Sequence, residues 1–212
     1  MTSTNSAKGR PRGGAADKRA ALLDGALTVF ARDGYTRASI DTIAEAAGVS
    51  TRTIYNHFQG KAELFEAVIQ ASSARTAQRQ LEVIDRHLRK VTDLAADLIE
   101  FGIEWAGPTI GTGEHFALVR QINAEAAHIP RTAIEAWQET GPLRVRRELA
   151  GHLQRLSDQG LLRITNADRA AVHLLVLVGA FNPSFPGAEP SAEEITEMVR
   201  TGVHAFLHGY AP

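Results

Sequence analysis

The sequence has no cysteine, few aromatic residues and no long apolar run. The absence of cysteine excludes disulfides, thiolate zinc sites and cysteine nucleophiles together. No apolar stretch reaches the roughly 18 residues that a membrane-spanning helix needs. The N-terminus is rich in Ser, Thr and Gly and lacks the apolar core of a signal peptide. These absences predict a cytoplasmic protein with no membrane partner.

Charge is divided unevenly along the chain, although the formal net charge is only −1. Residues 1–61 contain nine Lys or Arg and five Asp or Glu, whereas the remainder contains 14 basic and 19 acidic residues. A basic N-terminal part followed by an acidic remainder indicates that only the N-terminal part contacts a polyanion such as a nucleic acid. Chance segregation of the charges explains the same numbers, so charge alone does not decide.

Helical periodicity runs through almost the whole chain. Apolar residues recur at spacings of three and four, and no window shows the period-two alternation of a half-buried strand. With 44% hydrophobic residues among 212, the chain can bury a sizeable core. The predicted fold class is therefore all-α. Beyond the first 90 residues, we expect helices near residues 90–106, 113–128, 131–140, 142–160, 168–181 and 191–208.

The N-terminal part predicts an arm followed by a small helical domain. Residues 1–14 contain turn formers and no apolar periodicity, which predicts a flexible basic arm. The first helix begins near Ala16 and closes at Asp33-Gly34. We expect a three-helix helix-turn-helix domain over residues 15–61. A larger helical domain for regulation and dimerisation is expected over residues 62–212.

Two short helices joined by a tight turn follow the first helix. Ser39 is a suitable N-cap for a helix that ends at Ala47, and Gly48 permits a sharp turn. The second short helix starts after Ser50 and runs to about His57. Two helices joined by a short turn with glycine are typical of the helix-turn-helix motif.

The second short helix has one apolar and one polar side. Val49, Ile54 and Phe58 are expected to hold it against its neighbours. Its other side carries short hydroxyls, an amide, an imidazole and one arginine: Thr51, Arg52, Thr53, Asn56 and His57. Such groups can bond to base edges in the major groove, and Tyr55 and Lys61 add donors for phosphate oxygens. The alternative is a small three-helix domain whose polar helix has no DNA partner.

A longer sequence pattern surrounds these helices, from Gly34 to Leu64: GYTRASIDTIAEAAGVSTRTIYNHFQGKAEL. Its features are Gly34-Tyr35, Ile43-Ala44, Ala47-Gly48-Val49-Ser50, Ile54-Tyr55, His57-Phe58, and Lys61 followed by Leu64. In order and spacing, this run resembles the DNA-binding domain of TetR-family regulators.

The resemblance implies roles for the residues and partners for the protein. It implies that Thr51, Arg52 and Asn56 approach bases. It also implies that five residues hold phosphates: Ser39, Thr53, Tyr55, His57 and Lys61. A member of this family is expected to bind a palindromic operator in double-stranded DNA as a homodimer. Repression that is relieved by a small-molecule effector is the usual mode of the family.

The arm adds a short motif of its own, Lys8-Gly9-Arg10-Pro11-Arg12. It resembles the core of an AT-hook, in which extended Arg-Pro segments lie in a narrow minor groove. Narrow A·T-rich minor grooves attract arginine through their enhanced negative potential. Arg10 and Arg12 are therefore candidate DNA contacts. The alternative is a basic tail that only aids solubility.

The body contains a second region of resemblance and a set of candidate ligand contacts. Residues Ala117 to Gly160, including the IleAsnAlaGluAlaAla run at 122–127, look like the C-terminal domain of AefR-like regulators. Aromatic and polar residues on several helices could enclose a small, partly apolar ligand. The candidates are Phe101, Trp105, His115, Phe116, Asn123 and Trp137. Ordinary core packing is the alternative for each of them.

The last two helical segments are the candidates for a dimer interface. The run His173–Val178 is nearly unbroken in its apolar character, which is too hydrophobic for one exposed helix. A partner face is supplied by Ile195, Met198, Val199, Val203, Phe206 and Leu207. Two such helices from each subunit would form a four-helix bundle. Complete burial within one subunit is the alternative.

Catalytic and metal sites are not indicated. His204 and His208 share a helical face but have no third ligand nearby in the sequence, and a histidine near a helix C-terminus is favoured by the helix dipole. No phosphate-binding loop, dinucleotide fingerprint or nucleophile elbow occurs. We therefore expect no cofactor and no enzyme activity. The interpretation favoured by the sequence is a ligand-responsive DNA-binding regulator. The alternatives are a constitutive DNA-binding protein without a ligand and an all-α enzyme.

Overall fold

The computed structural model describes residues 15–107, 113–179 and 190–210. Every regular element in these ranges is an α-helix, which confirms the all-α prediction. None of the helices in the described ranges is both long enough and apolar enough to cross a bilayer. The helices are α1 (Ala15–Arg37), α2 (Ile40–Ala46), α3 (Thr51–Tyr55), α4 (Lys61–Leu88), α5 (Leu94–Ala106), α7 (Glu114–Glu125), α8 (Arg131–Thr140), α9 (Pro142–Asp158), α10 (Ala167–Val178) and α11 (Ala192–Tyr210).

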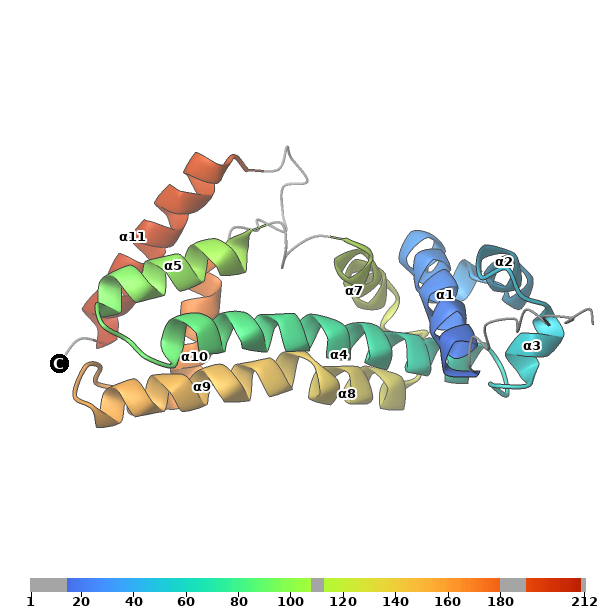
Figure 1. The fold of residues 1–212 in the computed structure, drawn as a ribbon, viewed down its shortest axis with the longest axis horizontal. Helices are drawn as coiled ribbons and strands as arrows, with labels where there is room; N and C mark the ends of the chain where they lie inside the picture. The colour runs from blue at the N-terminus through green and yellow to red at the C-terminus, as the bar shows by residue number, and fades with distance from the viewer. Residues whose placement is uncertain (1–14, 108–112, 180–189, 211–212) are drawn as a thin grey trace, which may run out of the picture.

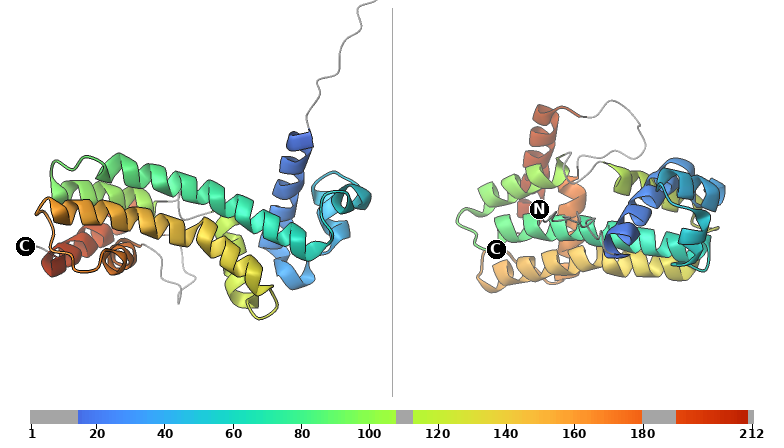
Figure 2. Two further views of the ribbon diagram at one scale, coloured as in Figure 1. Left: turned by 90° about the horizontal axis from the view of Figure 1, so that it is seen from below. Right: turned by 45° about the vertical axis from the view of Figure 1, so that its right-hand side comes forward.

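Helix α4 forms the long axis of the molecule (Figure 1). Its 28 residues extend about 42 Å at about 1.5 Å per residue. Helices α1, α2 and α3 form a head at its N-terminal end, and α10 and α11 lie toward the opposite end (Figure 1). Helices α8 and α9 run along α4, as both views of Figure 2 also show. The predicted helix-turn-helix domain and larger helical domain are therefore both present.

Two clusters of buried side chains lie along α4. The first joins the head to the start of α4 and to α7 and α8, and it centres on Phe65, whose ring lies edge-on to Phe30 and Tyr35 at 4.9 Å between centroids. The second joins the later part of α4 to α5, α9, α10 and α11. The two clusters meet within α4, near residues 72–76. Helices α7 and α8 belong to the first cluster and therefore pack with the head, although they lie many residues after the head in the sequence.

The end of α1 explains why the head and α7 fit together. Gly34 has φ 79° and interrupts the helical backbone of α1, at the position where the sequence predicts that the helix closes. Only glycine adopts such a φ without strain. A Cβ at this position would also collide with the carboxylate of Glu125 in α7. Gly34 therefore permits both the change of chain direction and the close approach of α7.

Candidate DNA-binding surface and regulatory core

The turn between α2 and α3 is held by backbone and side-chain caps. The Ser39 hydroxyl accepts from the Thr42 amide at 3.1 Å, as expected for the predicted N-cap. The C-terminus of α2 closes with two bonds, from the Val49 amide to the Ala44 carbonyl and from the Gly48 amide to the Glu45 carbonyl. This pair of bonds is a Schellman motif, and Gly48 adopts the positive φ of 64° that it requires.

Helix α3 is short and is held by its neighbours. Ser50 caps it by accepting from the Thr53 amide at 3.1 Å. Ile54 is fully buried, and Phe58 just beyond the helix is 4% exposed with the Arg19 guanidinium 5.7 Å from its ring centroid. A five-residue helix is not stable alone, so these buried anchors fix the direction in which its polar side faces.

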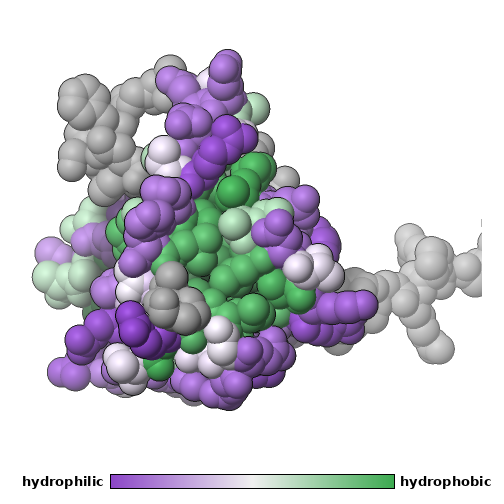
Figure 3. Space-filling model, turned by 90° about the vertical axis from the view of Figure 1, so that its left-hand side faces the viewer, coloured by the Kyte–Doolittle hydropathy of each residue, from purple (hydrophilic) through white to green (hydrophobic). Residues whose placement is uncertain are grey.

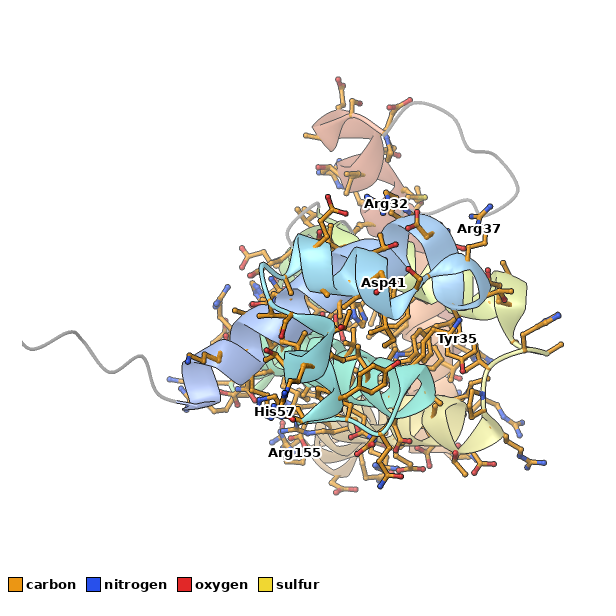
Figure 4. All side chains as sticks on the ribbon, turned by 90° about the vertical axis from the view of Figure 1, so that its right-hand side faces the viewer. Arg32, Tyr35, Arg37, Asp41, His57 and Arg155 are labelled. Atoms are coloured by element: carbon orange, nitrogen blue, oxygen red, sulfur yellow. The ribbon has the colours of Figure 1, made fainter. Side chains whose placement is uncertain are left out.

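The polar side of α3 faces solvent at the end of the molecule. Arg52, Tyr55, Asn56 and His57 are exposed, and Thr51 and Thr53 are half-buried. Figure 4 views this end, with His57 beside α3 and Asp41 on α2. Tyr55 exposes 58% of its surface, which is unusual for a large aromatic residue. Arg52 forms no ion pair with another described residue, so its guanidinium is available to a partner.

Lys61 lies at the start of α4 and is already partly engaged. Its ammonium donates to the carbonyls of Thr36 at 3.2 Å and Ala38 at 3.1 Å, and it lies 4.8 Å from the centroid of the Tyr35 ring. A lysine ammonium has three donors. These contacts use two of them, and the third remains for a phosphate oxygen. The phosphate contact of Lys61 therefore stays a prediction, and the contacts above fix the position of its ammonium group.

Lys61→Ala is expected to weaken binding to all DNA sequences and to lower the slope of log K against log salt by about one counterion per subunit. The reason is the loss of one phosphate contact and its counterion release. Lys90→Ala, at an exposed position beyond the far end of α4, is the matched control and should leave the slope unchanged. An unchanged slope for Lys61→Ala, in a variant whose circular dichroism matches wild type, would contradict the assignment.

Two predicted DNA contacts cannot be placed. Arg10 and Arg12 lie outside the described residues. The expectation that they enter a minor groove stays a prediction.

The six candidate ligand contacts fall in different places. Phe101 is buried in the second cluster, with the Trp105 ring 5.5 Å away between centroids. His115 and Phe116 lie together at the start of α7, with ring centroids 5.1 Å apart. Trp137 is buried in the first cluster, and Asn123 is exposed. The structure thus forms one aromatic pair on α5 and another at the start of α7, with Trp137 on α8 and Asn123 on the surface.

Helix α4 also carries a group of buried hydroxyls that was not predicted from the sequence. Ser72, Ser73 and Thr76, which we call the hydroxyl triplet, are 2%, 1% and 4% exposed. They lie where the two buried clusters meet. Their signal in the sequence is an interruption of the apolar stripe of α4, because small polar residues occupy positions at which leucine or isoleucine would continue the core.

His115 contacts the hydroxyl triplet and is electrostatically unusual. Its Nδ1 lies 2.9 Å from the Ser72 hydroxyl oxygen. Burial, with the positive charges of Arg79 and Arg75, lowers the pKa of His115 from 6.5 to about 4. The imidazole is therefore neutral at pH 7 in the folded protein.

This lowered pKa predicts that acid destabilises the protein through His115. Because the folded pKa lies below the unfolded one, the unfolded chain binds the proton more readily, so stability falls as the pH drops from about 6.5 to about 4. His115→Gln should lose less stability than wild type between pH 7 and pH 5, as measured by urea unfolding. Parallel losses in the two proteins would show that His115 does not titrate in this way.

Helix α7 also bonds directly to the head. The Glu125 carboxylate accepts from the Thr36 amide at 2.8 Å and from the Thr36 hydroxyl at 3.1 Å. At the other end of α7, Glu114 accepts from the Thr28 hydroxyl at 2.8 Å. Hydrogen bonds to an ionised acceptor are stronger than neutral ones. Helix α7 therefore connects the hydroxyl triplet, through His115, with the last turn of α1.

Comparison with known proteins agrees with this geometry. Residues 22–68 match the family described as bacterial regulatory proteins, tetR family, and residues 108–212 match the AefR-like transcriptional repressor C-terminal domain. The transcriptional activator FasR of Mycolicibacterium smegmatis is 38% identical over 90 residues, 40% of this chain and 41% of that protein. The chain thus matches less than half the length of this curated relative.

Solved structures match over a greater length. A TetR-family transcriptional regulator from Mesorhizobium loti MAFF303099 has a TM-score of 0.81 at 25% identity, covering 93% of this chain and 98% of that one. The flavonoid-responsive regulator FrrA has a TM-score of 0.66 at 26% identity, covering 93% and 99%. The chain therefore belongs to the TetR family of bacterial regulatory proteins, which are transcription factors rather than enzymes, and it carries an AefR-like C-terminal domain.

Proposed function

We propose that the protein is a homodimeric transcriptional repressor that binds a palindromic operator through α3 and releases it when a small molecule binds the body. The observation that carries the proposal is the exposed polar side of α3, fixed in direction by buried Ile54 and Phe58. Arg52, without an ion pair among the described residues, can donate to a guanine in the major groove. Genomic DNA as the partner makes the cytoplasm the place of action.

An apolar surface on α10 and α11 supports the dimer. Val176 is 72% exposed and Val172 is 38% exposed, both on α10. Beside them, a shallow groove of about 350 Å³ is lined by His173, Val176, Leu177, Ala205, Phe206, Gly209 and Tyr210. Figure 3 faces this end of the molecule and shows hydrophobic residues gathered on the surface with hydrophilic ones around them. An exposed apolar patch of this kind fits a second copy of the same face.

The position of this surface suits a palindromic operator. The α10–α11 surface and α3 lie toward opposite ends of the long axis (Figure 1). Two chains joined at α10 and α11 can therefore present their heads to the same DNA duplex. A two-fold dimer reads successive major grooves when its recognition helices are about 34 Å apart, one helical turn.

The effector part of the proposal rests on the links between body and head. Helix α7 bonds to α1 at Glu125 and Glu114, and α4 begins in the head and runs into the body. The dimer binds its operator only when its two recognition helices have the spacing of the DNA grooves. A ligand that binds better to a conformation with a different spacing would release the DNA, and the free energy that couples ligand binding to DNA binding is typically about 1–3 kcal/mol. The similar structure FrrA is named as flavonoid-responsive, which supports a small-molecule effector for this chain as well.

Repression, rather than activation, is favoured by the C-terminal match, which is to a repressor domain. The match to the activator FasR covers less than half of either chain. A constitutive DNA-binding protein without a ligand remains the second candidate. It differs from the proposal in having no compound that lowers operator affinity.

Genome-wide mapping of bound DNA with the full chain tests the proposal, and a gel shift on the bound segments measures their affinity. The expected result is a small set of bound segments, and genes beside them indicate the effector class. An effector should lower operator affinity by the same factor by which operator DNA lowers effector affinity. Binding spread evenly over the genome would contradict a specific regulator, and operator binding that no tested compound changes would favour the constitutive alternative.

A further inference from the structure

The backbone that joins α1 to α2 is held by charged side chains of two other helices. Gly34 interrupts the helical backbone of α1, so the amide of Thr36 needs an acceptor outside that helix. The Glu125 carboxylate of α7 accepts from this amide at 2.8 Å and from the Thr36 hydroxyl at 3.1 Å. The Thr36 carbonyl accepts from the Lys61 ammonium of α4 at 3.2 Å. One residue is therefore bonded on one side to a carboxylate and on the other to an ammonium.

The segment held in this way is linked to two of the predicted phosphate contacts. Lys61 is one of them, and its second bond is to the Ala38 carbonyl at 3.1 Å. Ser39, which caps α2, is the other and follows Thr36 by three residues. A displacement of Thr36 therefore moves an acceptor that orients the Lys61 ammonium. A carboxylate repels phosphate, so Glu125 can favour DNA binding only through the residues that it holds.

A second bond between α7 and the head provides a contrast. The Glu114 carboxylate accepts from the Thr28 hydroxyl at 2.8 Å. Thr28 precedes Gly34, in the part of α1 whose backbone is regularly helical. Among the described residues of α5 to α11, Glu125 alone hydrogen-bonds to residues 34–39. Gly34 leaves room for its carboxylate, because a Cβ there would collide with it.

We propose that Glu125 is a positioning residue for DNA binding, which holds Thr36 and thereby orients the Lys61 ammonium toward a phosphate. The inference rests on the proposed DNA-binding function and adds a residue to it. Helix α7 lies beside α1 (Figure 1), but Glu125 belongs to residues 108–212, which match the AefR-like C-terminal domain. The DNA-binding surface is therefore completed by a side chain from outside residues 15–61, the range that the sequence predicts for the DNA-binding domain.

The direction of the effect on DNA affinity separates positioning from simple charge. Loss of a carboxylate that acts only through space would strengthen DNA binding, because the repulsion of phosphates falls. Glu125→Ala is expected instead to weaken binding of the full chain to operator and to random-sequence DNA, each by about three- to tenfold per subunit, the effect of one lost hydrogen bond. Fluorescence anisotropy with labelled duplexes measures both affinities.

Glu114→Ala is the matched control, because it removes the same charge and a bond to a threonine hydroxyl from the same helix. It should leave both DNA affinities unchanged or raise them slightly. Glu125→Gln keeps the size of the side chain and a neutral acceptor, so its affinities should lie between those of wild type and Glu125→Ala. This variant keeps the test decisive if Glu125→Ala does not fold.

Acetylation of lysines in the free protein tests the positioning without DNA. Lys61 is held by two carbonyls in wild type, whereas Lys90 is exposed and serves as the reference in the same chain. Glu125→Ala should raise the acetylation rate of Lys61 relative to Lys90 about twofold or more, because the held segment opens more often. Mass spectrometry of the digested protein measures the ratio. An unchanged ratio would overturn the positioning role.

A double-mutant cycle tests whether Glu125 acts through Lys61. In the Lys61→Ala background, Glu125→Ala should weaken DNA binding less than it does in wild type, because the group that it positions is already absent. Losses that simply add would show that Glu125 affects DNA binding by another route, and would overturn the inference.

The two readouts distinguish this inference from the proposed function. If wild type binds its operator and folded Glu125→Ala binds it equally well, the proposed function stands and the positioning role is overturned. If the acetylation ratio changes as expected but wild type has no specific DNA site, the contact between Glu125, Thr36 and Lys61 is upheld and the proposed function fails.

Discussion

Val176→Asp is expected to separate the proposed dimer into folded monomers and to weaken operator binding by about a hundredfold or more. Val176 is 72% exposed in the single chain, so an aspartate there does not disturb the core of one subunit. In the dimer, the same aspartate would be buried without a partner on both copies, which costs several kcal/mol. A monomer has one head, and it loses the gain in effective concentration that the second head provides.

Sedimentation velocity and a gel shift on the operator measure the two effects. Val176→Thr is the matched control, because it keeps the size and shape of the side chain and adds no charge. It should remain dimeric with operator affinity close to that of wild type. If Val176→Asp sediments as a dimer and binds the operator normally, then α10 does not form the interface.

Arg52→Ala is expected to cost about 1–3 kcal/mol per half-site on the operator and to relax base preference at one position in each half-site. Arg52 is the only long cationic side chain on the exposed side of α3, and arginine paired with guanine is the commonest specific contact in the major groove. Both half-sites of a palindrome lose this contact, so the loss of binding free energy on the full operator is twice the loss on one half-site.

The ratio of operator affinity to random-sequence affinity is the decisive measurement for Arg52. Arg37→Ala removes the same charge from an exposed position of the head that precedes α2, and it should leave this ratio unchanged. Arg52→Ala should lower it. If Arg52→Ala weakens operator and random DNA equally, Arg52 contacts a phosphate and not a base.

The helix-turn-helix could be predicted from the sequence because its determinants are local. Ser39 and Ser50 cap helices that begin within one or two residues of them, and Gly48 takes the positive φ that the turn needs. The later helices were also placed within a few residues. For example, α8 has the expected bounds, and α10 begins one residue earlier than expected and ends at Val178. The last two residues of that expected helix, 180 and 181, lie outside the described ranges.

The packing of α7 on the head could not be predicted, because it joins residues far apart in the sequence. Nothing near Thr36 indicates that Glu125 will accept two of its hydrogen bonds. For the same reason, the sequence does not reveal that Lys61 is bonded to the carbonyls of Thr36 and Ala38. Periodicity identifies which residues are apolar, but it does not say which helices share a core.

The regulatory core was only partly foreseen. Phe101 and Trp105 form one aromatic pair on α5, and His115 and Phe116 form another on α7, but Asn123 is on the surface. The hydroxyl triplet could have been noticed as a break in the apolar stripe of α4. A break alone is compatible with a solvent-facing segment, and only the structure shows that it is buried.

Selection of bound sequences from a random pool of DNA duplexes, with the full chain, tests the central claim most directly. A homodimer that reads DNA through α3 should enrich an inverted repeat. Its half-site centres should lie about one helical turn, or a whole number of turns, apart. An unrepeated single site, or the absence of any enriched sequence, would contradict the account.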